Sequence, residues 1–138
     1  MTKYLLDTNV VSELRKPRPH GGVVGWLNDQ LDDQLFLSAV TMGQLQAGVE
    51  RIRRQDSSKA NEIELWADQL AASYQILPMD TACFREWGRL IDQRPDELLE
   101  DAMIAATARV HDLVVATRNE VDFRQLRVRI LNPFKTSQ

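Results

Sequence analysis

The sequence of 138 residues has little cysteine and histidine and no long apolar run. Its single cysteine, Cys83, excludes an internal disulfide, and one cysteine with two histidines excludes a structural zinc site. A membrane-spanning helix needs about 20 consecutive apolar residues, which the sequence lacks. The first ten residues also lack the apolar core of a secretory signal. We therefore expect a cytoplasmic protein without a membrane segment.

Composition and size are those of one globular domain, because 43% of the residues are hydrophobic and 27% are charged. We expect this domain to occupy residues 1–138, with a short loose tail from about residue 133. A net charge of −3 is unusual for a general nucleic-acid binder, so contact with nucleic acid would need local basic clusters. The three candidate clusters, each equally compatible with a solvated face, are Arg15, Lys16 and Arg18; Arg51, Arg53 and Arg54; and Arg124, Arg127 and Arg129.

Short apolar runs alternate with segments of helical periodicity along the chain. The predicted strands cover residues 3–6, 35–37, 76–77, 113–116 and 128–131. A helical turn is predicted at 12–15, and helices are predicted at 22–31, 58–74 and 81–91. A further helix is capped by Thr41 and runs to residue 52, and the last runs from Asp96 or Glu100 to His111. This alternation predicts an α/β fold, a three-layer α/β/α sandwich with a parallel sheet of about five short strands.

Four polar side chains fall near the carboxyl ends of predicted strands, where open parallel sheets bind their ligands. Asp7 follows the first strand, and Gln44 lies one turn into the helix after the second. Asp101 starts an alanine-rich helix, and Asp122 follows the fourth strand. Carboxylates that meet in one pocket repel one another unless a cation neutralises them. Magnesium and manganese prefer such oxygen ligands and support hydrolysis of phosphodiesters.

Each of these side chains also has an ordinary structural explanation. Asp7 could cap the following turn, and Asp101 could be a favourable charge in the first turn of its helix. Asp122 could be a loop residue and Gln44 an ordinary helix residue. Other residues that invite a functional interpretation but fit the core or a helix end better are Trp26, Trp66, Trp87, Cys83 and His111.

Four segments resemble, in order, the PIN domains of the VapC type. They are LLDTNVVSE (5–13), LSAVTMGQLQAGV (37–49), EDAMIAATA (100–108) and VATRNEVDF (115–123). The chain also ends in Asn132, Pro133 and Phe134, as members of the FitB-like branch end in Asn-Pro and an aromatic residue. The resemblance extends over nearly the whole chain.

The resemblance implies a function as well as a PIN-like fold. It implies a Mg²⁺ or Mn²⁺ site and an endoribonuclease that cleaves structured RNA such as tRNA or rRNA, acting as the toxin of a type II toxin–antitoxin system. It further implies a homodimer and a cognate VapB/FitA-like antitoxin, whose C-terminal segment lies over the active-site groove. Operator DNA would be reached only through that antitoxin.

Site residues follow from the same resemblance, position by position. The metal-binding aspartates match Asp7, Asp101 and Asp122, although relatives differ in whether position 119 or 122 supplies the last acid. The polar neighbours that orient or surround these acids match Thr8, Asn9, Thr117 and Asn119. If the groove binds RNA, the arginines expected to hold phosphates are Arg15, Arg18 and Arg118.

Gln44 departs from the family pattern, which has glutamate at this catalytic position. Glutamine keeps the shape and one carbonyl oxygen but loses the charge, so metal affinity should weaken. The chain could be a weakened or poor enzyme, or a nearby acid such as Glu50 could compensate. The alternative function is a catalytically weak or inactive PIN domain that acts by binding the antitoxin and, through it, operator DNA.

Overall fold

A computed structural model of the protein describes residues 1–135. Five strands form one sheet in the order β3-β2-β1-β4-β5, and every neighbouring pair is parallel. The strands are β1 (Tyr4–Leu6), β2 (Leu35–Ser38), β3 (Gln75–Leu77), β4 (Val114–Ala116) and β5 (Ile130–Leu131). The predicted parallel sheet is confirmed.

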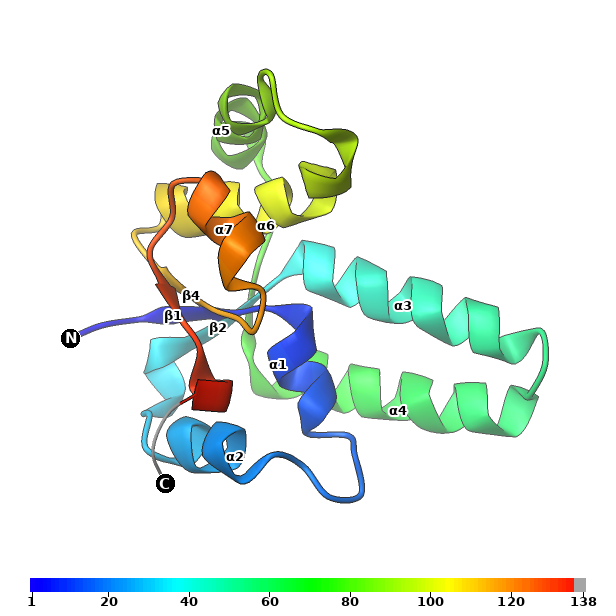
Figure 1. The fold of residues 1–138 in the computed structure, drawn as a ribbon. Coiled ribbons are helices and arrows are strands. Elements are labelled where there is room, and N and C mark those ends of the chain that lie inside the picture. The colour runs from blue at the N-terminus through cyan, green and yellow to red at the C-terminus, as the bar shows by residue number, and fades with distance from the viewer. Residues whose placement is uncertain (136–138) are drawn as a thin grey trace.

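Helices cover both faces of this sheet (Figure 1). They are α1 (Thr8–Glu13), α2 (Gly21–Asn28), α3 (Ala39–Arg53), α4 (Ser57–Ser73), α5 (Thr81–Ile91), α6 (Leu99–Val110) and α7 (Glu120–Gln125). Three short 3-10 turns cover residues 32–34, 96–98 and 133–135. Helices α3 and α4 lie side by side and extend from the sheet as a hairpin (Figure 1).

Two hydrophobic cores, one on each face of the sheet, account for the three layers. Leu5 and Val115 pack on one face with Phe123 of α7 and the alanines of α6. Leu6 and Ala116, one position further along the same strands, pack on the other face with α1 and α2. Successive side chains of a strand point to opposite faces, so these short apolar strands serve both cores. The alanine-rich helix α6 packs closely against the sheet, since its fully buried residues include Ala102, Ala105, Ala106 and Ala108.

The start of α3 differs from the sequence-based expectation. Thr41 is not its N-cap, because Ser38 at the end of β2 accepts a hydrogen bond from the Val40 amide at 3.0 Å and the helix begins at Ala39. Thr41 is instead fully buried in the first turn of the helix. The turn predicted at 12–15 overlaps the end of a helix that begins earlier, at Thr8, where Asp7 caps it, and that ends at Glu13.

Helix α7 was not predicted, and Asp122 therefore lies on a helix rather than in a loop. This helix has six residues, too few for apolar periodicity to show in the sequence. Its fully buried Phe123 fixes it against α6 and the sheet. Because α7 follows β4 directly, Asp122 stays near the carboxyl edge of the sheet.

The end of the described chain packs against two earlier segments. The ring centroid of Phe134 lies 5.3 Å from that of His20, and the guanidinium carbon of Arg118 lies 3.8 Å from the Phe134 centroid. The predicted tail starts at this turn, and its last residues, 136–138, lie outside the described part of the chain. In residues 1–135 we find no helix with the length and apolar character that a membrane crossing requires.

Candidate active site

A polar pocket of about 520 Å³ lies at the carboxyl edge of the sheet. Strand β1 leads into it, helices α1 and α3 form one wall, and the first turn of α6 forms the other. Its lining residues are Asp7, Thr8, Asn9, Ser12, Gln44, Ala47, Arg51, Glu100, Asp101 and Asn119. The chain thus brings three of the four candidate catalytic side chains, Asp7, Gln44 and Asp101, into one pocket from segments far apart in the sequence.

Asp7 is held rigidly at the bottom of this pocket. Its side chain is buried and accepts hydrogen bonds from the Thr8 amide (2.8 Å), the Asn9 side-chain amide (3.1 Å) and the Thr117 hydroxyl (2.8 Å). Burial raises the pKa of the Asp7 carboxyl, and these donors only partly offset that effect. Asp7 therefore has two roles: its carboxylate caps α1, and the residue also lines the pocket.

Asn119 links the other two aspartates. Its side-chain amide donates to Asp101 Oδ2 at 3.1 Å and to Asp122 Oδ2 at 2.9 Å. The Thr117 hydroxyl, which donates to Asp7, also accepts a hydrogen bond from the backbone N–H of Asn119 at 2.9 Å. Asp122 does not line the pocket itself and reaches it through Asn119. The segment after β4 thus connects all three aspartates.

Negative charge gathers in the pocket, and Arg51, which also lines it, forms no ion pair with these acids. The pKa of Asp101 is raised to about 6, first by burial and then by the charges of Asp7 and Asp122. Glu100 adds a smaller contribution in the same direction. Within residues 1–135, no lysine, arginine or histidine forms an ion pair with any of these three aspartates. Such uncompensated charge favours a bound cation.

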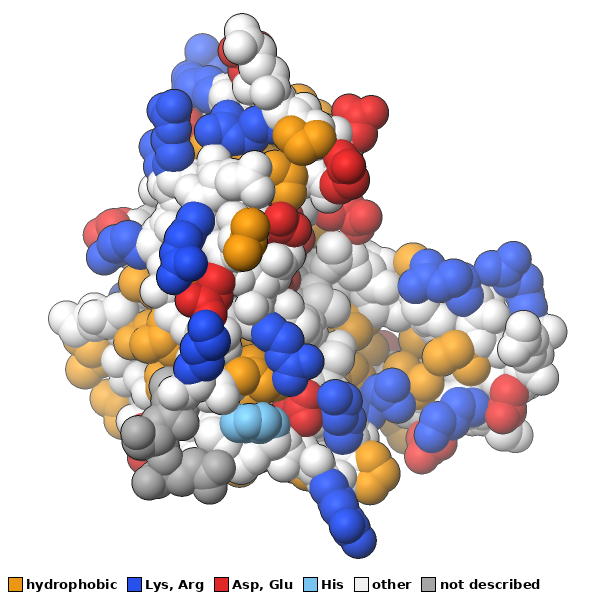
Figure 2. All heavy atoms as spheres, viewed as in Figure 1, with side chains coloured by type: hydrophobic (Ala, Val, Ile, Leu, Met, Phe, Trp, Pro, Cys, Tyr) orange, Lys and Arg blue, Asp and Glu red, His pale blue; other side chains and the backbone are white. Residues whose placement is uncertain are grey.

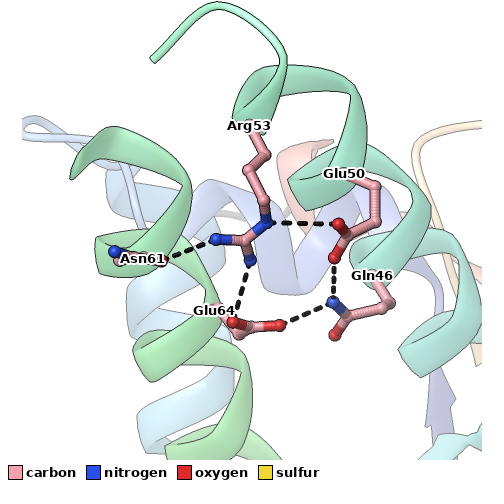
Figure 3. A network of polar contacts seen from close by, with 5 residues as sticks. All are labelled: Gln46, Glu50, Arg53, Asn61 and Glu64. Carbon is pink, nitrogen blue, oxygen red and sulfur yellow. Dashed lines mark hydrogen bonds and ion pairs between the residues drawn. The ribbon is translucent and has the colours of Figure 1, made fainter. Parts of the chain in front are cut away.

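Gln44 lies between the two walls of the pocket. Its carbonyl oxygen accepts a short hydrogen bond from the Thr8 hydroxyl, and its amide donates to Glu100 Oε1 at 3.1 Å. Glu50, the acid considered as a substitute, instead contacts Gln46 and Arg53 on another face of α3 (Figure 3). The acid beside Gln44 is therefore Glu100 and not Glu50.

The arginines that the sequence suggests for RNA binding, Arg15, Arg18 and Arg118, lie outside the lining of the pocket. In Figure 2, lysines and arginines lie over the α3–α4 hairpin, beside α1 and, at the upper left, over the region of α5, α6 and α7. Arg15 lines a separate hollow with Trp66, and Arg118 stacks on Phe134. Arg18 is exposed and lies outside the lining of the site pocket. Arg51 is the arginine that lines the pocket; it lies seven residues after Gln44, about two helical turns, which is a signal that could have identified it.

The donor set fits a hydrated divalent cation. Among residues 1–135, no three histidine, cysteine, aspartate or glutamate side chains are close enough to hold one metal ion. Magnesium, however, is commonly bound through one or two carboxylates and keeps several of its waters. Asp7 and Asp101 share the pocket, both have a raised pKa, and both lack a basic partner in the described chain. These two acids match that mode of binding.

Comparison with known proteins agrees with this arrangement of fold and pocket. The family model described as the PIN domain matches residues 4–128. The chain belongs to the PIN domain family. Toxin FitB of Neisseria gonorrhoeae is 34% identical over 137 residues, which cover 94% of this chain and 97% of FitB. The VapC ribonuclease Y4jK of Sinorhizobium fredii is 32% identical over 136 residues, covering 95% and 97%.

Solved structures show the same fold. FitAcB from Neisseria gonorrhoeae matches with a TM-score of 0.86 and 31% identity, covering 96% of this PIN domain and 99% of the other chain. FitAB bound to an IR36 DNA fragment matches with a TM-score of 0.84 and 30% identity, covering 98% of both chains. The resemblance seen in the sequence is therefore confirmed at the level of family and fold.

Proposed function

We propose that this PIN domain is the toxin of a type II toxin–antitoxin system and acts as a Mg²⁺- or Mn²⁺-dependent endoribonuclease on structured RNA such as tRNA or rRNA. The observation that carries the proposal is the pocket in which Asp7, Glu100 and Asp101 lie together without a basic partner in residues 1–135. Relatives named as a toxin and as a VapC ribonuclease support it.

The mechanism assigns the cation to Asp7 and Asp101, with Asp122 acting through Asn119. When bound, a divalent cation supplies activation of water and stabilisation of the charge that builds on a phosphodiester. Thr117 and Asn9 hold the Asp7 carboxylate in one orientation. Asn119 holds the Asp101 carboxylate by a second amide contact. These fixed side chains keep the acids oriented, so little reorganisation is needed when substrate enters.

Substrate binding is assigned to arginines around the pocket. Arg51 lines it and forms no ion pair with any described residue, so its guanidinium is available to a phosphate. Arg15, Arg18 and Arg118 remain candidates for contacts further along the RNA. Binding through such residues should weaken steeply as salt rises, because bound phosphates release their counterions.

The proposed partners are a cognate VapB/FitA-like antitoxin and a second copy of the chain. The antitoxin would cover the pocket, and operator DNA would be reached through it. A solved relative of the same fold, FitAB bound to an IR36 DNA fragment, supports an assembly of this kind.

Gln44 supports one alternative function. Because position 44 lacks the carboxylate that the resemblance to PIN domains leads us to expect there, the chain could be a PIN domain that binds antitoxin and, through it, operator DNA without cleaving RNA. A cleavage assay on total RNA, with Mg²⁺ or with EDTA, separates the two functions. We expect cleavage by the wild type with metal, none by Asp7→Asn, and at least wild-type cleavage by Gln44→Glu.

The outcomes of that assay are distinct. Cleavage by Gln44→Glu alone would favour the alternative function. If neither form cleaves any RNA with metal present, the proposed nuclease activity is wrong for this chain. Mapping the cleavage sites of an active form would identify the RNA target.

A further inference from the structure

Gln44 and Glu100 form a contact across the pocket, from α3 to the first turn of α6. The Gln44 amide nitrogen donates to Glu100 Oε1 at 3.1 Å, and the Gln44 carbonyl oxygen accepts from the Thr8 hydroxyl. Both groups of the Gln44 amide are therefore used. A carboxylate at position 44 could not donate this hydrogen bond and would instead repel the Glu100 carboxylate.

Glu100 is exposed in the first turn of α6 and makes few contacts in the described part of the chain. It forms no ion pair there, and Gln44 is its hydrogen-bond partner. Asp101 already places a negative charge in the first turn of α6, where one acid suffices to interact with the helix dipole. The Glu100 side chain nevertheless lines the same pocket as Asp7 and Asp101.

We infer that Glu100 supplies the negative charge that Gln44 lacks, acting on the cation through one of its bound waters, and that Gln44 is the positioning residue that holds Glu100 over the pocket. The inference rests on the proposed function, because it assigns Glu100 to the same divalent cation. Glu100 on α6 gives the pocket a third acid beside Asp7 and Asp101, while position 44 on α3 carries an amide. Magnesium keeps several of its waters, through which a nearby carboxylate can act on it.

The inference can be tested by removing the carboxylate at position 100 and introducing one at position 44. Mn²⁺ binding is measured by electron paramagnetic resonance titration of the wild type, Glu100→Gln, Gln44→Glu/Glu100→Gln and Asp7→Asn. We expect Glu100→Gln to weaken Mn²⁺ binding about tenfold and the double variant to recover most of that loss, because it has the ligand charge of the family pattern. Glu97→Gln, the same substitution three residues earlier on the exposed turn before α6, should bind like the wild type.

The results separate this inference from the proposed function. Wild-type Mn²⁺ affinity in Glu100→Gln, together with lost binding in Asp7→Asn, overturns the role of Glu100 and leaves the metal site in place. If Glu100→Gln weakens Mn²⁺ binding and the double variant does not restore it, a carboxylate at position 44 cannot replace the one at position 100. This result overturns the proposed relation between Gln44 and Glu100. If the wild type itself binds no Mn²⁺, the proposed metal-dependent activity fails, and the inference fails with it. Circular dichroism of each variant checks that the fold is retained.

Discussion

Two groups of carboxylates in this PIN domain have opposite surroundings. On the α3–α4 hairpin, Arg53 contacts Glu50 at 3.1 Å and Glu64 at 2.9 Å (Figure 3). Gln46 donates to both acids at 2.7 Å, and Asn61 accepts from Arg53 at 2.6 Å. Hydrogen bonds from Gln46 and Arg53 lower the pKa of Glu50. Every charge in this network has an opposite charge or an amide beside it.

The pocket at the edge of the sheet has the reverse arrangement. Its acids contact hydroxyls and amides, and in the described residues none of its aspartates has a basic partner. Burial, and then repulsion from Asp7 and Asp122, raise the pKa of Asp101 to about 6. Carboxylates that the protein balances itself stabilise the hairpin, whereas carboxylates it leaves unbalanced are available to an external cation. The following substitutions test that distinction.

The largest expected effect is on catalysis. Asp7→Asn should reduce metal-dependent RNA cleavage by roughly 100-fold or more, because it removes a ligand charge from the pocket. Asparagine is also a good helix cap, so α1 should keep its start. Glu50→Gln, a loss of one carboxylate charge on the hairpin, should leave the cleavage rate near that of the wild type. Equal cleavage rates for Asp7→Asn and the wild type would show that the pocket carboxylates contribute no more to catalysis than those of the hairpin.

Removal of the Asp101 charge should stabilise the metal-free protein. Because the folded-state pKa of Asp101 is raised, its protonated form stabilises the fold, and this contribution is lost as pH rises from about 4 through about 6. In EDTA at pH 7, Asp101→Asn should therefore increase the free energy of unfolding by about 1 to 2 kcal/mol, allowing for its partial exposure. Urea unfolding at pH 7 and pH 4 measures this. A destabilised variant at pH 7 would show that the pocket charge is already balanced.

RNA affinity should respond to the arginine in the pocket. Arg51→Gln should weaken binding of a labelled RNA in EDTA by about 3- to 10-fold and reduce the salt dependence by about one phosphate contact. Fluorescence anisotropy at several salt concentrations measures both. Arg54→Gln is the matched control, because Arg54 ends the same helix outside the pocket lining. Identical salt slopes for the two variants would argue against Arg51 as a phosphate contact.

The smallest expected effect belongs to the hairpin. Arg53→Gln leaves Glu50 and Glu64 without their basic partner, but Glu50 is exposed and Glu64 is partly exposed, so water can replace the contact. Thermal unfolding should shift by no more than about 2 °C, with RNA cleavage unchanged. A loss of cleavage would show that the hairpin network supports the active site.

The sequence predicts the architecture and part of the pocket well. Alternating strands and helices determine a parallel sheet, and parallel strands put Asp7 and Asp101 at the same edge. The start of α3 could not be decided in this way, because Ser38 and Thr41 are both good caps and only the extended backbone of Ser38 selects it. Helix α7 is too short for periodicity and depends on the burial of Phe123.

The acid next to Gln44 could not be predicted either. Glu50 is near Gln44 in sequence, but it lies on a face of α3 that contacts α4. Glu100 is far away in sequence and reaches Gln44 because α6 packs beside α3. Which face of a helix meets the pocket depends on this tertiary packing. Asn119 is a similar case, since its link between Asp101 and Asp122 requires α7 to follow β4 directly.

Calorimetric titration with Mn²⁺ tests most directly whether the unbalanced aspartates hold a cation. The wild type and Glu50→Gln should each bind one ion per chain in the pocket, and Asp7→Asn should show no binding heat. Wild-type binding heat in Asp7→Asn would place the ion elsewhere and contradict the assignment of this pocket.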